Sequence, residues 1–203
     1  MDFASPIESL VTGSRGKVLA ALARSGAETT LRGLSRQADV SPNHVGTIIG
    51  DLVELGLVER REAPPASLVR LSPTNIASTL LRRIADLTGI VTGQMAATAA
   101  SIQPAPVSLI VFGSFVHGRA GRDSDIDVAA VCSPEAVDDD TFLEALWSWA
   151  AEVTALTGNT VNLVIEDAPT ATGRLKAESG VWGAIRREGI SLVGMAPEDL
   201  ARS

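Results

Sequence analysis

This sequence is poor in cysteine and histidine: among its 203 residues it has one cysteine, Cys132, and two histidines. A lone thiol cannot close an internal disulfide, and two scattered histidines do not supply the clustered ligands of a zinc site. Cys132 follows an apolar run, so we expect a packed small side chain rather than a reactive thiol. Such cysteine use fits a reducing compartment, and we expect a cytoplasmic protein.

Long apolar runs are missing as well. No stretch approaches the roughly 18 uninterrupted apolar residues that a membrane-spanning helix needs, so we expect no membrane partner. The first residues, 1–6, have neither a basic nor an apolar region of the kind found in secretion signals. With 45% hydrophobic residues, the chain can still build one large or two small cores.

An excess of positive charge is also absent, since the net charge is −7. Residues 1–75 hold eight Lys/Arg and eight Asp/Glu, whereas residues 76–203 hold nine and sixteen. Nucleic-acid-binding regions usually have a basic excess, because phosphate neutralisation supplies much of their affinity. DNA binding by the neutral first part would therefore need arginines gathered on one face, or two copies of the chain.

What the sequence does contain is the motif G-S-x-x-x-G-x-x-x-x-x-S-D-x-D, which runs from Gly113 to Asp127. Apolar runs lie on both sides of it, at 107–112 and 128–131, so we expect a strand before and a strand after the motif. Asp125 and Asp127 would leave the same face of the second strand. Two close carboxylates beside a Gly-Ser turn suit a hard divalent cation that carries a nucleoside triphosphate.

This motif resembles the signature of the DNA polymerase β-like nucleotidyltransferase superfamily, in particular its minimal bacterial members. The resemblance implies a mixed sheet with helices on one side, and transfer of a nucleotidyl group from an NTP with the help of Mg²⁺ (or Mn²⁺). It further implies that Gly113 and Ser114 hold the triphosphate and that Asp125 and Asp127 are catalytic residues that bind the metal. Ser124, in the same motif, is a further candidate nucleotide-binding residue.

One position departs from the pattern of this family. Its members carry a third carboxylate on a later apolar strand, but the matching run here, 160–165, has Asn162. An amide oxygen can coordinate a metal, yet the amide is uncharged and cannot accept a proton as a base. Glu166 lies on the same strand face but roughly 13 Å further along, too far to substitute. Asn162 is therefore a candidate catalytic residue, and the sequence supports nucleotide binding more strongly than turnover.

The first 75 residues predict three helices followed by two short strands. Apolar residues at helical spacing indicate helices over 14–25, 31–39 and 42–55, and strand-like runs follow at 57–62 and 68–71. This order resembles a bacterial winged helix-turn-helix domain. The resemblance implies DNA binding, whereas a protein-interaction domain with ordinary solvated arginines is the alternative.

In a winged helix-turn-helix domain, the third helix would read the major groove of DNA. Its face opposite the apolar stripe carries Asn43, His44 and Thr47, and Asn43 and Thr47 can hydrogen-bond base edges. Arginines on the second helix and just before the wing tip are candidates for phosphate contacts. These are Arg32, Arg36, Arg60 and Arg61.

Between the two parts, residues 75–103 predict one long helix or a broken pair of helices. Apolar residues recur at helical spacing from Ile76 to Met95, and Gly89 and Gly93 weaken the centre. The apolar stripe could be the first helix of the transferase domain, or it could pair with a second copy as the seam of a homodimer.

These patterns divide an α+β protein into three parts. Residues 1–75 form the winged helix-turn-helix domain, residues 76–104 a connecting helix, and residues 105–203 the nucleotidyltransferase domain with its mixed sheet and helices. The last nine residues are expected to be frayed.

Three functions remain open at this point. The protein could be an enzyme that transfers a nucleoside monophosphate from an NTP to a protein, RNA or small-molecule acceptor. It could be a transcriptional regulator whose transferase domain binds nucleotide as a signal, and Asn162 favours this function. It could also be one half of a toxin–antitoxin pair whose winged helix represses the operon. The intact Gly-Ser and Asp motif favours the first and third functions.

Overall fold

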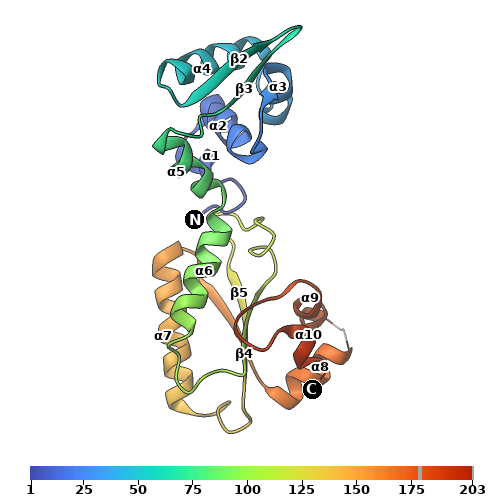
Figure 1. Cartoon of the computed structure of the whole chain (residues 1–203). Coiled ribbons are helices and arrows are strands. Elements are labelled where there is room, and N and C mark those ends of the chain that lie inside the picture. The colour runs from blue at the N-terminus through green and yellow to red at the C-terminus, as the bar shows by residue number, and fades with distance from the viewer. Residues whose placement is uncertain (178–179, 203) are drawn as a thin grey trace. The chain divides into compact units, whose positions relative to one another are not determined.

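The computed structural model describes residues 1–177 and 180–202, and the chain divides into two compact units (Figure 1). The unit Ser5–Leu87 is called the N-terminal unit. The other unit combines Met1–Ala4 with Thr88–Ser203 and is called the transferase unit after the family that its motif resembles. In the part of the chain that is described, no helix is long and apolar enough to cross a membrane.

The N-terminal unit packs five helices against a small antiparallel sheet with the strand order β1-β3-β2. All three expected helices and both expected strands are present, with bounds that differ by no more than two residues from those predicted. The helices are α1 (Pro6–Leu10), α2 (Gly13–Ser25), α3 (Leu31–Ala38), α4 (Pro42–Glu54) and α5 (Ile76–Ala85), and the strands are β1 (Thr29–Thr30), β2 (Val58–Ala63) and β3 (Ala66–Leu71).

Local hydrogen bonds fix the turn between α3 and α4. Thr30 caps α3, because its side chain accepts a hydrogen bond from the backbone of Gly33 at 3.0 Å. Asp39 ends α3 in the left-handed conformation with a φ of 49°. The Ser35 hydroxyl then donates to the carbonyl of Val40 at 2.6 Å, so α4 starts from a defined position relative to α3.

The apolar stripe of α4 forms the centre of the core of the N-terminal unit. Val45, Ile48, Ile49 and Leu52 recur at helical spacing, and each is at most 4% exposed. They belong to one buried cluster with residues of α2, β2 and β3. The same helix therefore turns its other face, with Asn43, His44 and Thr47, to solvent.

The stripe between the two parts forms a broken pair of helices. The first, α5, ends at Ala85, and the second, α6, is Leu87–Ala99. Leu81 and Ile84 pack against the core of the N-terminal unit, whereas Val91 and Met95 are buried in the transferase unit. The stripe is thus divided between two cores, while Ile76 and Leu80 at its start are 74% and 50% exposed.

The transferase unit is built on a mixed sheet, as the family resemblance implied, and its strand order is β6-β5-β4-β7. The central strands β4 and β5 are antiparallel, β4 and β7 are antiparallel, and β5 and β6 are parallel. The strands are β4 (Ser108–Phe112), β5 (Ile126–Cys132), β6 (Val161–Asp167) and β7 (Ile190–Gly194), and the remaining helices are α7 (Asp140–Thr157), α8 (Ala168–Ala177), α9 (Gly180–Glu188) and α10 (Pro197–Leu200).

Helices cover both faces of this sheet, so the expectation of helices on one side is wrong. Residues of α8, α9 and the end of the chain pack on the face formed by Ile110, Phe112, Ala129 and Val131. In Figure 1, α6 and α7 lie on the opposite side of β4 and β5 from α8–α10. All five residues of β4 are buried, because helices cover both faces of the sheet. A strand buried in this way is apolar at most consecutive positions rather than at alternate ones.

Both ends of the chain pack on the transferase unit. The Phe3 ring meets the Phe115 ring edge to face at 4.8 Å, and the Phe3 backbone donates to the carbonyl of Ala120 at 2.9 Å. At the other end, Leu200 and Ala201 are 1% and 7% exposed and belong to the core. The expected fraying of the last nine residues is therefore wrong up to residue 202, and Ser203 lies outside the described residues.

Candidate nucleotide-binding site

The Gly-Ser turn begins directly after β4 and approaches Asp127 closely. Phe112, the last residue of β4, is the register partner of Asp127 on β5, so Gly113 comes next to the Asp127 side chain. Gly113 has a φ of +76°, and a Cβ at this position would come within 3.0 Å of Asp127 Oδ2. The positive φ favours glycine, and a Cβ at this position would crowd the Asp127 carboxylate.

Asn162 lies beside Asp127 on the other side. The two residues are register partners on the parallel strands β5 and β6, and Asn162 Nδ2 donates to Asp127 Oδ1 at 3.0 Å. Three adjacent strands thus bring Gly113, Asp127 and Asn162 together at one edge of the sheet. Asp125 is exposed and lies one residue before the first residue of β5, so its expected position on the strand is wrong.

The two candidate serines of the motif have different positions. Ser114 is exposed in the turn, and its carbonyl accepts a hydrogen bond from the backbone of Arg119 at 2.9 Å. Ser124 Oγ accepts from the backbone of Gly121 at 3.0 Å. The Ser124 hydroxyl therefore closes the loop before Asp125, whereas Ser114 lies exposed in the Gly-Ser turn.

The side chain of Asn159 holds this loop through hydrogen bonds. The sequence did not reveal this contact, because Asn159 follows a glycine after a helix and indicates only a turn. It is 2% exposed, and its Nδ2 donates to the carbonyls of Gly121, Arg122 and Ser124 at 3.2, 3.4 and 2.9 Å. Its Oδ1 accepts from the N-terminal ammonium of Met1 at 2.7 Å. One buried amide thus fixes the backbone that leads into Asp125.

A second long-range contact closes the Gly-Ser turn against α9. His117 Nε2 lies 2.7 Å from Glu188 Oε2, and both side chains are about one-third exposed, at 35% and 31%. Glu188 is the last residue of α9, so this pair connects the turn to the helix that precedes β7. Sequence reasoning did not find this pair, because the partners are 71 positions apart.

The donor set of the site fits one hard divalent cation. Asp125 and Asp127 could supply two carboxylates, and Asn162 could add an amide oxygen. In residues 1–177 and 180–202, no group of three or more His, Cys, Asp or Glu side chains is placed to hold a metal ion. Two carboxylates would balance the charge of one divalent cation.

The nearby acids of β6 do not supply the missing charge. Glu166 pairs with Arg174 at 2.9 Å and lies four residues along β6 from Asn162, as the sequence predicted. Asp167 Oδ1 accepts a hydrogen bond from the Thr170 backbone at 2.9 Å, and this bond lowers the pKa of the Asp167 carboxyl. Both side chains are thus engaged with α8.

Cys132, at the end of β5, is 1% exposed. Burial, followed by the nearby charges of Asp167 and Glu166, raises the pKa of its thiol. A buried thiol that stays protonated is a poor nucleophile. The expectation of a packed small residue is therefore confirmed.

In the N-terminal unit, the candidate DNA-binding residues lie on α3, on α4 and on the β2–β3 hairpin. Asn43, His44 and Thr47 are exposed on α4, where the Thr47 hydroxyl donates to the carbonyl of Asn43 at 3.3 Å. Arg32 and Arg36 are exposed on α3. They line a hollow of about 600 Å³, named here the α3 hollow, whose other lining residues are Thr30, Leu31, Pro65, Ala66 and Ser67.

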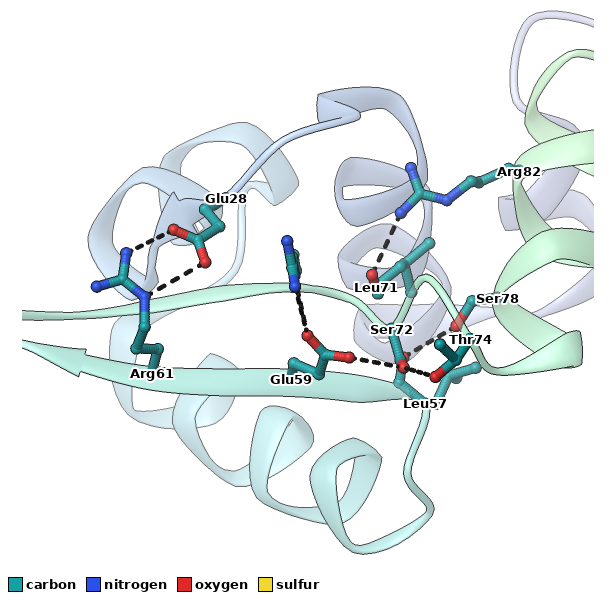
Figure 2. A network of polar contacts seen from close by, with 10 residues as sticks. Glu28, Leu57, Glu59, Arg61, Leu71, Ser72, Thr74, Ser78 and Arg82 are labelled. Atoms are coloured by element: carbon teal, nitrogen blue, oxygen red, sulfur yellow. Dashed lines mark hydrogen bonds and ion pairs between the residues drawn. The ribbon is translucent and has the colours of Figure 1, made fainter.

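The arginines of the β2–β3 hairpin are held by carboxylates. Figure 2 shows Arg61 against Glu28, with Nη2 2.7 Å from Oε2. Arg60 Nε donates to Glu62 Oε1 at 3.1 Å, and Arg70 Nε donates to Glu59 Oε2 at 2.9 Å. The hydrogen bond from Arg61 lowers the pKa of Glu28 and raises that of Arg61.

The Glu59 carboxylate extends this network toward α5. It also accepts from the Ser72 hydroxyl at 2.9 Å, and Ser72 lies 3.3 Å from the hydroxyl of Thr74, as Figure 2 shows. Hydrogen bonds from Arg70 and then Ser72 lower the pKa of Glu59. The hairpin is thereby attached at both of its ends through ionic and polar contacts.

Comparison with known proteins identifies the class of domain in the transferase unit. Residues 95–178 match the family model of the nucleotidyltransferase domain. This segment contains the Gly-Ser turn, Asp127 and Asn162, so the class of domain expected from the motif is confirmed. No curated protein matches the chain.

Two solved structures resemble part of the chain. One is a toxin–antitoxin crystallised with AMP-PNP, with 23% identity, a TM-score of 0.39, and coverage of 55% of this chain and 81% of that chain. The other is a mutant of the toxin–antitoxin MntA–HpeT, with 20% identity, a TM-score of 0.38, and coverage of 55% and 80%.

Proposed function

We propose that this protein is a metal-dependent nucleotidyltransferase that moves a nucleoside monophosphate from an NTP to an acceptor hydroxyl. The observation that carries this proposal is the convergence of Gly113, Asp127 and Asn162 at one edge of the sheet. The convergence lies within the segment that matches the nucleotidyltransferase domain. A turn with glycine at a positive φ next to a carboxylate suits a bound metal–triphosphate.

Each residue of the site has a defined part in this function. Asp125 and Asp127 would hold Mg²⁺ or Mn²⁺, which neutralises charge on the triphosphate when it is bound. The backbone of Gly113 and the exposed Ser114 would bind phosphate oxygens, and the amide of Asn162 orients Asp127 through its hydrogen bond. In the transfer, the acceptor oxygen bonds to the α-phosphorus, pyrophosphate leaves, and the acceptor proton passes to solvent.

A second candidate function is favoured by Asn162 itself. The amide is uncharged and cannot take the acceptor proton, and Glu166 is engaged by Arg174. A transferase unit of this kind would bind Mg²⁺–NTP and turn it over slowly. In that case the protein is a transcriptional regulator that senses nucleotide through this unit and binds DNA through the other.

For the N-terminal unit we propose a winged helix-turn-helix fold that binds DNA. Support comes from the order of α2, α3, α4 and the β2–β3 hairpin, and from the polar, exposed face of α4.

Since the N-terminal unit has little excess positive charge, we expect two copies to bind DNA together, with half-sites one helical turn or about 10 base pairs apart. Gel shifts on the upstream region of its own gene, with a measured solution mass, test this. A monomer without any shift at low salt would contradict it.

Calorimetry with ATP and GTP, with and without Mg²⁺, tests the nucleotide site. The double variant Asp125→Ala/Asp127→Ala should lose Mg²⁺–NTP affinity by more than about 100-fold, because even outer partners of metal ligands contribute 10–100-fold. Asp123→Ala is the matched control, since Asp123 is in the same loop and its side chain is 95% exposed. Equal affinity of the double variant and the unaltered protein would eliminate the site.

A further inference from the structure

We propose that the α3 hollow, through Arg32 and Arg36, binds the phosphates of a DNA duplex, and that the hairpin arginines Arg60 and Arg61 do not. This inference rests on the proposed DNA binding of the N-terminal unit and assigns it to one surface. It separates four arginines that look equivalent in the sequence.

Most cations of the N-terminal unit are paired with carboxylates. Residues 5–87 hold ten Lys/Arg and eight Asp/Glu, a net charge of +2. Six of the ten cations are within ion-pair distance of a carboxylate: Arg15, Lys17, Arg24, Arg60, Arg61 and Arg70. Arg82 donates to the carbonyl of Leu71 at 3.2 Å. The positive field of this unit must therefore come from its other cations, Arg32 and Arg36 among them.

The hairpin is close to neutral as a surface. Glu28 lies against Arg61, Glu62 against Arg60, and the Ser67 hydroxyl also donates to Glu62 at 2.8 Å. A phosphate that approached either arginine would have to displace a carboxylate that already occupies its guanidinium. The exchange of a carboxylate for a phosphate at the same guanidinium gains little binding free energy, and few counterions are released from the DNA.

The α3 hollow has the opposite character. Arg32 and Arg36 are four residues apart on one helix, so their side chains project from the same side. No described residue provides either guanidinium with a hydrogen-bond or ion-pair partner. Both line a hollow of about 600 Å³ opposite the hairpin tip at Pro65 and Ala66. Free guanidinium groups present the planar donor arrangement that phosphate oxygens fit.

The position of α4 indicates that the phosphates belong to a duplex rather than to a small anion. The turn after α3 is fixed by the hydrogen bond from Ser35 to Val40, and α4 starts two residues later with exposed Asn43, His44 and Thr47. A duplex that received α4 in its major groove would place its backbone across the preceding helix. The same turn thus presents phosphate-binding and base-reading groups together.

Salt dependence of duplex binding, measured by fluorescence anisotropy on a labelled duplex from the upstream region, distinguishes the two arginine pairs. The slope of log K against log salt is negative, and Arg32→Ala/Arg36→Ala should reduce its magnitude by about 1.8, because each phosphate contact contributes about 0.9. Its affinity should fall about 30-fold or more. Arg60→Ala/Arg61→Ala removes the same charge and should leave the slope unchanged and the affinity within about threefold.

Two further arms complete this test. Glu28→Gln/Glu62→Gln frees the hairpin arginines without removing them, and it should raise the magnitude of the slope and the affinity. Inorganic phosphate at millimolar concentration should not displace the duplex beyond its effect on ionic strength. Displacement at constant ionic strength would instead identify the α3 hollow as a site for a free phosphate ion and overturn the assignment to DNA.

The failure of the inference differs from the failure of the function on which it rests. If Arg60→Ala/Arg61→Ala lowers the magnitude of the slope as much as Arg32→Ala/Arg36→Ala, DNA binding stands and the assignment to the α3 hollow is wrong. If the unaltered protein binds no duplex at low salt, the DNA-binding function itself is wrong. Circular dichroism melting of each variant shows whether the N-terminal unit remains folded.

Discussion

The two units of this protein carry opposite charge and hold their functional groups by different means. Residues 5–87 have a net charge of +2, whereas residues 1–4 and 88–203 hold seven Lys/Arg and sixteen Asp/Glu, a net charge of −9. In the N-terminal unit, exposed ion pairs such as Arg61–Glu28 position the hairpin. In the transferase unit, strand register positions Gly113, Asp127 and Asn162, and the buried amide of Asn159 holds the loop before Asp125.

This difference has consequences for how each site responds to its surroundings. Exposed ion pairs are weak and are screened by salt, so the hairpin is sensitive to ionic strength. Backbone register and a buried amide are not screened in this way. The transferase site should therefore keep its geometry over a wide range of salt, but it should need a cation before it can bind a polyphosphate.

Replacing Asn162 with aspartate tests whether charge limits the transferase unit. We expect Asn162→Asp to raise nucleotidyl transfer by about 100-fold, within the range for a positioned general base. Nucleotide affinity should change little, which is the pattern of a transition-state effect. Rates from single-turnover experiments with labelled NTP check this, and Asn162→Ala is the control.

The same variant has a second expected property. Asn162 Nδ2 donates to Asp127 Oδ1 at 3.0 Å, so a carboxylate at residue 162 would repel Asp127 when no cation is present. The melting temperature of Asn162→Asp should fall without Mg²⁺ and recover with it. An unchanged transfer rate would mean that a partner molecule supplies the missing group.

Removing the buried amide of Asn159 tests the claim that the transferase loop is held from within. Asn159→Ala leaves three carbonyl groups without their donor, and we expect a loss of about 2 kcal/mol in the free energy of unfolding. Nucleotide affinity should fall too, because the backbone before Asp125 is no longer fixed. Denaturant unfolding and calorimetry measure the two effects. Asn43→Ala, an exposed asparagine, should show neither, and a stable Asn159→Ala protein with full affinity would refute this function of Asn159.

The smallest expected effect concerns the ion pair of Glu28 in the N-terminal unit. The folded-state pKa of Glu28 is lowered by the hydrogen bond from Arg61, so its stabilisation is present above the unfolded pKa and is lost as pH falls through the folded value. Glu28→Gln should lower the melting temperature slightly at neutral pH and not at strongly acidic pH. Thermal melts over this range check the sign, with the exposed Glu54→Gln as control. A difference that grew toward acidic pH would contradict it.

Local patterns predicted more of the structure than of the site. Periodicity and turn residues placed three helices and two strands of the N-terminal unit and the two strands beside the motif, because each such signal lies within a few neighbouring residues. The motif from Gly113 to Asp127 identified the class of domain for the same reason. The departure at Asn162 was also visible, since it lies within an apolar strand.

Contacts between distant residues could not be read from the sequence. Asn159 reaches Gly121 across 38 positions, and Arg61 reaches Glu28 across 33. The burial of Phe3 against Phe115 has no local signal either. These contacts depend on which surfaces meet after folding, and the candidate DNA-binding arginines became distinguishable only when their partners were known.

Transfer of label from NTPs tests the central claim most directly. The protein is incubated with each α-labelled NTP and Mg²⁺ or Mn²⁺, with and without cell extract, beside Asp125→Ala/Asp127→Ala. The account predicts that label moves to an acceptor only with the unaltered protein and a divalent cation. Label transfer that persists in the double variant, or that needs no cation, would contradict it.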